Sequence, residues 1–187
     1  MALNVSSAGD KKRITFGPGV LKLGKTQTDG TTPSLADVGY ARGGSLQLTR
    51  QKLDVFQGSP RALIETYAVQ EDVILNFTSI QWDPAKFVFA MGSGVTSTSG
   101  AKEIFQFGGE VFFNEVGLQF IHRTPTNGTV EIKIWKAQGQ GEFNINFADD
   151  VQEFAYNFRA LEALTDWENA SLGTNKRLAY IAFTPGP

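Results

Sequence analysis

Apolar residues recur at every second position in several stretches of the chain, which is the spacing of a strand with one buried and one polar face. This alternation is clearest in residues 45–49, 72–80, 116–121 and 130–135. Shorter or less regular strands are predicted for residues 14–16, 20–23, 62–69 and 178–183. Residues 154–164 fit the spacing of a strand and that of a helix, and we favour a strand. The pattern predicts a chain that is mainly β.

The apolar pattern changes parity within one of these strands. Leu46 and Leu48 lie on one face, whereas Leu53 and Val55 carry the pattern on the other face. A continuous strand would flip its buried face at this point, so we predict a β-bulge or a sharp bend within residues 50–52. Gly58-Ser59-Pro60 then predicts a turn.

A hairpin is predicted around Asn127-Gly128, the residue pair that favours a tight turn with positive φ. It joins the strands at 116–121 and 130–135. Gly139-Gln140-Gly141 leads to a further alternating stretch at 142–147, which predicts another strand.

One short helix is predicted at about 83–92. Asp83 can cap the free backbone N–H groups, Pro84 suits the first helical position, and Gly92 suits the left-handed position after the last turn. Stretches rich in Gly, Ser and Thr predict long loops at 24–37 and 92–101, and residues 1–13 read as a polar N-terminal arm.

About eight to ten strands and one short helix favour an antiparallel β-sandwich or barrel. We expect a single domain over residues 1–187, with the arm at 1–13 and the long loop at 24–37.

Composition narrows the possible chemistry. The 187 residues are 41% hydrophobic and 12% aromatic, which is enough for a core, and the net charge of −2 argues against a strongly basic nucleic-acid binder. The chain has no Cys and one His, His122, so Cys-ligated metals, disulfides and His-rich metal sites are excluded. No phosphate-binding glycine loop or serine nucleophile elbow occurs. We therefore expect no enzyme, no cofactor and no metal. The composition does not exclude chemistry that needs carboxylates alone, such as glycoside hydrolysis, because the chain contains 19 Asp and Glu residues.

No signal peptide is recognisable near the N-terminus, and no apolar stretch approaches the roughly 18 residues of a membrane span. We expect a protein made in a cytoplasm and without a membrane partner.

The order of elements in residues 38–92 resembles that of phage tail tube proteins, also called major tail proteins. The resemblance rests on the segments Asp37-Val38-Gly39-Tyr40, Gly43-Gly44-Ser45-Leu46, Thr78-Ser79-Ile80 and the helix from Asp83 to Met91. Residues 154–166 are similar to the last long strand of that family. The resemblance implies a sandwich fold and hexameric rings that stack into a hollow tube through which DNA leaves the capsid. The type VI secretion protein Hcp shares that fold, so a secretion tube stays open.

The resemblance also implies a location and partners. The location would be the virion tail, after assembly in the host cytoplasm. The partners would be further copies of the chain, a tape measure protein, a tail terminator, baseplate or tip proteins, and DNA in transit without specific binding. Strands 45–56 and 62–80 and the region 129–147 are then candidates for the inner sheet. Strand parity nominates the channel-facing residues Ser45, Gln47, Thr49, Glu131, Lys133, Glu142, Asn144 and Asn146. Six copies of net charge −2 give about −12 per ring, a field that keeps DNA from sticking.

Two other functions remain open on the residues alone. Trp82, Trp135 and Trp167 could be stacking platforms of a carbohydrate-binding or decoration module, although packing within the core or between subunits is the simpler role. Glu65, Glu131 and Glu142 could include a catalytic carboxylate pair, but no spacing singles them out.

Overall fold

The structure is a computed structural model that describes residues 19–26, 33–142, 144–145 and 151–186. The predicted strand at 14–16 and the N-terminal arm at 1–13 lie outside these residues. The fold is mainly β, as predicted. Its strands and helix are, in chain order, β1 (Val20–Lys25), β2 (Ala36–Asp37), β3 (Ala41–Gln57), β4 (Ala62–Ser79), α1 (Pro84–Met91), β5 (Val95–Ser99), β6 (Lys102–Gln106), β7 (Glu115–Arg123), β8 (Thr129–Gly139), β9 (Phe154–Ala160) and β10 (Tyr180–Thr184).

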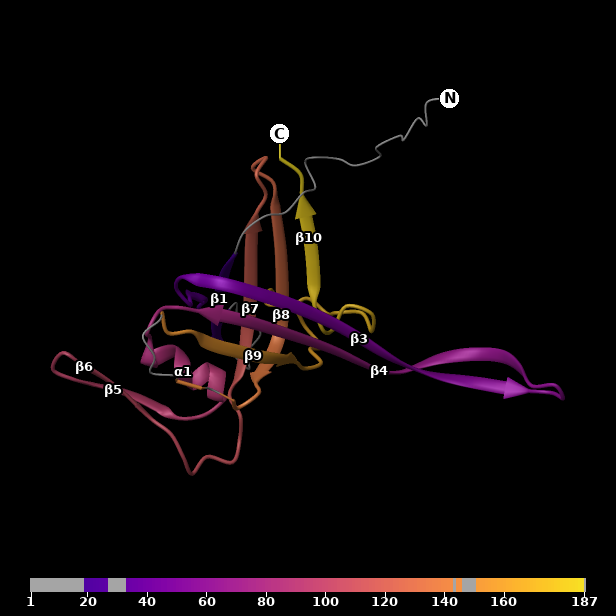
Figure 1. Cartoon of the computed structure of the whole chain (residues 1–187), viewed down its shortest axis with the longest axis horizontal. Helices are drawn as coiled ribbons and strands as arrows, with labels where there is room; N and C mark the ends of the chain where they lie inside the picture. Colours follow the sequence, from indigo (N-terminus) through magenta and orange to yellow (C-terminus); the bar gives the residue numbers. More distant parts are fainter. Residues whose placement is uncertain (1–18, 27–32, 143, 146–150, 187) are drawn as a thin grey trace.

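Eight of these strands form one antiparallel sheet in the order β2-β1-β7-β8-β9-β4-β3, with β10 paired to β8. β5 and β6 form a separate hairpin. In Figure 1, β7, β8 and β10 run across the direction of β3, β4 and β9. The sheet therefore bends between β8 and β9 and folds over into two crossed layers.

The core lies between the two layers and beside α1. From the β4 side it receives Val73, Leu75 and Phe77, which are at most 4% exposed. The other layer and β9 contribute equally buried side chains, namely Leu21, Leu23, Val116, Leu118, Ile134, Phe154, Tyr156 and Phe158. Alternation along each strand is what directs these residues inward, so the predicted faces of 72–80 and 116–121 are confirmed.

The predicted helix is confirmed with its caps. The carboxylate of Asp83 accepts a hydrogen bond from the backbone N–H of Ala85 at 3.1 Å, and Pro84 opens the helix. Gly92 ends it in the left-handed region at φ 72°. Phe87 and Ala90 are the buried residues that fix this two-turn helix to the core.

The predicted irregularity within residues 50–52 is confirmed, but its consequence differs from the expectation. Gln51 pairs with Gln70 and Lys52 pairs with Ala68, so the extra residue is Val69 on the partner strand β4. No buried face has to flip, because the strands beyond this point leave the body and bury neither face. The segments predicted at 62–69 and 72–80 are one strand, β4.

The hairpin between β7 and β8 is confirmed, although its connection is longer than a two-residue turn. Asn127 adopts φ 60°, and Thr124 and Gly128 close the loop through a backbone hydrogen bond of 2.8 Å. A register shift next to Leu118 places an extra residue in β8. This shift lets both Ile134 and Ala137 face the core despite their odd spacing.

Three loop or strand predictions need correction. The stretch 24–37 is not a loop throughout, because β1 extends to Lys25 and β2 pairs with it at residues 36–37. The stretch 92–101 contains β5, which pairs with β6 and which Gly100 follows in a turn at φ 62°. Within 142–147, the described residues Glu142, Asn144 and Ile145 lie outside any strand.

The strand favoured at 154–164 is confirmed as β9, which ends at Ala160, and the strand predicted at 178–183 is β10. In the described part of the chain, no helix is long and apolar enough to cross a membrane.

Candidate functional site: a polar sheet face and a projecting hairpin

The outward face of β3, β4 and β9 is mainly polar, and we call it the polar face. Ser45 pairs with Asn76, which pairs in turn with Asn157. Residues in such a row share one face of the sheet, and this face is opposite to that of Leu75 and Phe77 in the core. The rows on either side add the remaining outward residues, namely Gln47, Ile74, Arg159, Thr49, Asp72, Thr78 and Ala155.

Side-chain hydrogen bonds on this face are weak except at one charged pair. The amide of Asn76 donates to the hydroxyl of Ser45 at 3.4 Å. In contrast, the guanidinium of Arg159 donates through Nε to Oδ1 of Asp72 at 2.9 Å, and its terminal nitrogen forms an ion pair with the same oxygen. Gln70 donates to the other carboxylate oxygen at 2.5 Å.

The pair between Asp72 and Arg159 sets the electrostatics of this face. The hydrogen bonds from Arg159 and then from Gln70 hold the pKa of Asp72 below its usual value. The carboxylate is therefore charged at neutral pH and cancels the charge of Arg159. The polar face carries no other charged side chain in these rows, so it is close to neutral.

The structure brings together three of the eight residues nominated for a channel wall. Ser45, Gln47 and Thr49 lie on the polar face of β3. Glu131 and Lys133 lie on β8 between β7 and β10, so they are not in rows with Ser45.

Glu131 and Lys133 form their own cluster. The amide of Gln119 donates to Glu131 at 2.6 Å, Lys133 approaches the same carboxylate at 3.2 Å, and its Nζ lies 5.7 Å from the centre of the Tyr180 ring. Glu142 and Asn144 are exposed outside the strands, and Asn146 lies outside the described residues.

Sequence reasoning missed the β4 and β9 half of the polar face. The parity of residues 72–78 already separates Ile74, Asn76 and Thr78 from the core residues. Parity along one strand does not reveal which strand lies beside it, so the rows through Asn157 and Arg159 required the fold.

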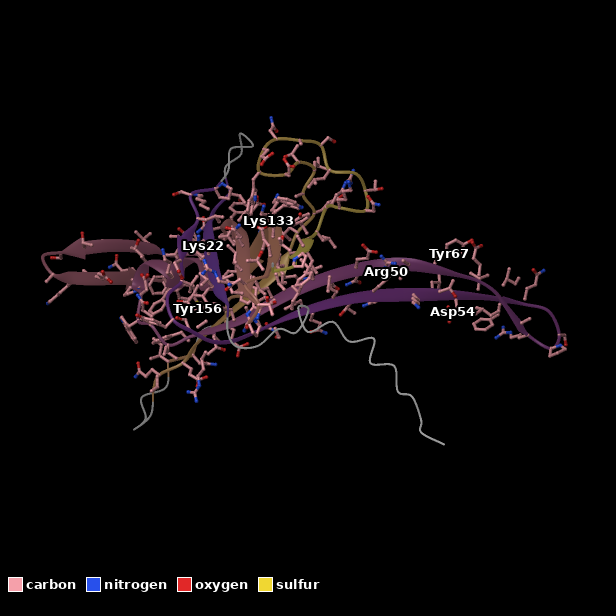
Figure 2. All side chains as sticks on the ribbon, turned by 90° about the horizontal axis from the view of Figure 1, so that it is seen from above. Lys22, Arg50, Asp54, Tyr67, Lys133 and Tyr156 are labelled. Atoms are coloured by element: carbon pink, nitrogen blue, oxygen red, sulfur yellow. The ribbon has the colours of Figure 1, made fainter. Side chains whose placement is uncertain are left out.

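The distal half of the β3–β4 hairpin, residues 50–71, projects from the body as a two-stranded ribbon that we call the arm (Figure 1). Figure 2 shows Arg50 near its base and Asp54 and Tyr67 farther out along it, away from the rest of the chain. Every residue of the arm is exposed. Its large apolar side chains are 39–58% exposed, namely Leu53, Val55, Phe56, Leu63, Ile64, Tyr67 and Val69.

Polar contacts within the arm are local. Arg50 pairs with Glu71 across the strands, and the hydroxyl of Thr66 donates to Asp54 at 2.7 Å. Tyr67 donates its phenolic hydrogen to Glu65, and this hydrogen bond raises the pKa of Tyr67. Such contacts order the ribbon but cover none of its apolar surface. A two-stranded ribbon with no third strand is marginally stable in water, and exposed apolar patches of this kind are typical of interaction surfaces.

The three tryptophans considered as stacking platforms pack against other parts of the chain. The indole of Trp167 donates to the carbonyl of Trp135 at 3.0 Å, and the two rings meet edge to face. Trp82 packs edge-on against Phe87 and Phe154. These contacts fit the packing role that we took as the simpler one.

The carboxylates considered for hydrolysis are spread over separate elements. Glu65 lies on the arm and Glu131 on β8, whereas Glu142 follows β8 outside any strand. His122 is buried on β7. Among the described residues, no group of three or more His, Asp or Glu side chains could hold a metal ion.

Comparison with known proteins identifies no family for this chain. No protein-family model matches the chain, and no curated protein matches it. One similar solved structure is described as the tail of an empty GTA particle computed with helical refinement, with C6 symmetry. Its TM-score is 0.39 and its identity 11%, over 78% of this chain and 92% of that chain. Because this TM-score is below 0.5, the function argued below rests on the chain's own surfaces.

Proposed function

We propose that this protein is a structural virion protein that assembles into stacked hexameric rings and forms a tail tube, a conduit for DNA during ejection. The observation that carries the proposal is the arm. Its apolar residues lie on both faces, because Leu53 pairs with Tyr67 on one face while Phe56 pairs with Leu63 on the other. A ribbon that is apolar on both faces has to lie between neighbours, and a repeating assembly supplies such neighbours.

The free edge of the sheet supports the same proposal. β3 is the last strand of the sheet order, so its outer edge has no strand partner within the described part of the chain. Long exposed edges promote association unless they are covered. A copy of the same chain placed around a ring would cover this edge.

The polar face supports the role of a conduit. It carries hydroxyl and amide groups, and its one cation, Arg159, is neutralised by Asp72. A wall of this kind offers a phosphate backbone no free positive charge to bind, so DNA would pass without being held. In the proposed tube the tape measure protein lies inside, and the tail terminator and the baseplate or tip proteins close the ends.

Shortening the arm tests the proposal. In the variant, residues 52–69 are replaced by Asn-Gly, which joins Gln51 to Gln70 through the turn that suits a two-residue hairpin. Wild-type protein should form rings or tubes with increasing concentration, as seen by sedimentation and electron microscopy. The shortened variant should stay monomeric and melt at an unchanged temperature, because the arm contributes nothing to the core. A wild-type protein that stays monomeric at every concentration would refute the proposal.

A further inference from the structure

A second exposed apolar surface lies between β6 and β7, on the opposite side of the body from the tip of the arm (Figure 1). It is formed by Phe107, Val111, Phe112 and Phe113, which are 50–87% exposed. These residues line a groove of about 290 Å³. Met91, at the end of α1, also lines it.

This segment is tied to the helix end. The backbone N–H of Asn114 donates to the carbonyl of Gly92 at 2.5 Å, and the carboxylate of Glu110 accepts from the N–H of Gly94 at 3.0 Å. Gly108 adopts φ 131° and Gly109 φ 81°, values that other residues rarely adopt, so the sharp bend of the groove depends on glycine. The exposed aromatic residues are therefore presented by a defined loop.

We propose that this groove receives the tip of the arm of another copy of the chain. The tip has the matching properties: Phe56 and Leu63 form an exposed apolar pair, and Arg61 lies beside them at the turn. The structure records no ion pair for Arg61 among the described residues, and the same is true of Glu110 at the groove. Apolar surface would meet apolar surface, and a cation would meet a carboxylate that accepts only a backbone N–H within its own chain.

The position of the two surfaces determines the kind of assembly. When the arm of one copy binds the groove of the next, the pair still has a free groove at one end and a free arm at the other. Further copies can therefore add at both ends, and the assembly grows into a ring or a tube. Contact between two arms would instead stop at a dimer. This inference rests on the proposed function and adds to it the surface that the arm binds.

Charge reversal tests the contact. Arg61→Glu and Glu110→Arg should each raise the concentration needed for assembly about tenfold, because each places like charges at the contact. The double variant should assemble close to the wild-type concentration, because the pair is restored in the opposite sense. Both side chains are exposed and outside the core, so the melting temperature should change by no more than the loss of the one hydrogen bond from Gly94 to Glu110 explains. Single variants that assemble like wild type, or a double variant no better than either single one, would overturn the inference.

Cysteine crosslinking gives a second, independent readout, because the chain has no native cysteine. A variant with both Leu63→Cys and Phe112→Cys should give a ladder of oligomers longer than dimers under oxidation. Each single substitution should give no efficient crosslink. Efficient dimers from Leu63→Cys alone would show contact between two arms and overturn the inference. Wild-type protein that never assembles would overturn the proposed function itself, whereas wild-type rings without the ladder would overturn only the arm-to-groove contact.

Discussion

Replacing apolar residues of the arm with serine should separate folding from assembly. Leu53, Phe56 and Leu63 are 55%, 52% and 54% exposed in the single chain, so about half of each side chain still has to leave water when a neighbour covers the arm. Full burial of such a side chain contributes roughly 1.5–3 kcal/mol, so covering the exposed half contributes about 1 kcal/mol. The three residues together contribute about 3 kcal/mol per contact. This corresponds to a roughly 100-fold higher concentration for assembly.

The triple variant Leu53→Ser, Phe56→Ser and Leu63→Ser is best measured by sedimentation over a wide concentration range, with thermal unfolding of the monomer alongside. The melting temperature should stay within about 2 °C of wild type, because none of the three residues packs in the core. Leu164→Ser is the matched control, since Leu164 is 64% exposed and is not one of the arm residues 50–71. Unchanged assembly of the triple variant would refute the reasoning, as would an equal loss in the control.

Three further predictions concern the body of the protein. Asp72→Asn frees Arg159 on the polar face, so DNA should bind the assembled protein more strongly. The plot of log binding constant against log salt concentration should become steeper by up to about 0.9 per new phosphate contact. An unchanged slope in fluorescence anisotropy would contradict this. Gly139→Ala should lower the melting temperature by roughly 2–10 °C, because its Cβ would meet the backbone carbonyls of Phe89 and Ala90 at less than 3 Å; a wild-type melting curve would show that the helix can move away. Burial, helped by the charge of Asp83, raises the pKa of Tyr156 above its ordinary value of 10.0, so the folded state favours the neutral phenol. The contribution of this group to the free energy of unfolding is therefore complete below pH 10 and is lost as the pH rises further. Tyr156→Phe should flatten the alkaline dependence of the free energy of unfolding.

Strand alternation predicted most of the fold because the buried faces are regular. The core residues of β4 and β7 follow period two without interruption, and Asp83, Pro84 and Gly92 define the helix through local chemistry that depends on no distant contact. Where a strand has no buried face, the same reasoning fails. The Gly, Ser and Thr content of residues 92–101 predicts a loop, whereas β5 forms there because its partner β6 supplies the hydrogen bonds that hold it, although every residue of β5 is exposed.

The candidate site was predictable in part for a related reason. Parity placed Ser45, Gln47 and Thr49 on one polar face, and the structure agrees. It could not distinguish that face from the polar face of β8, because both are defined only as not being core. Glu131 and Lys133 satisfy the parity rule as well as Ser45 does, yet β9 lies between β4 and β8 in the sheet order and the sheet turns a corner there.

The irregularity opposite Gln51 explains how one pair of strands serves both the core and the arm. On the body side of this point, β4 alternates between Val73, Leu75 and Phe77 in the core and the outward residues Asp72, Ile74, Asn76 and Thr78. The extra residue, Val69, interrupts the ladder, and bulges increase the local twist of a strand pair. Beyond it the ribbon leaves the sheet, and neither of its faces packs against the core. Apolar side chains can then occupy both faces, which is the property that an element inserted between neighbours requires and that an ordinary surface strand avoids.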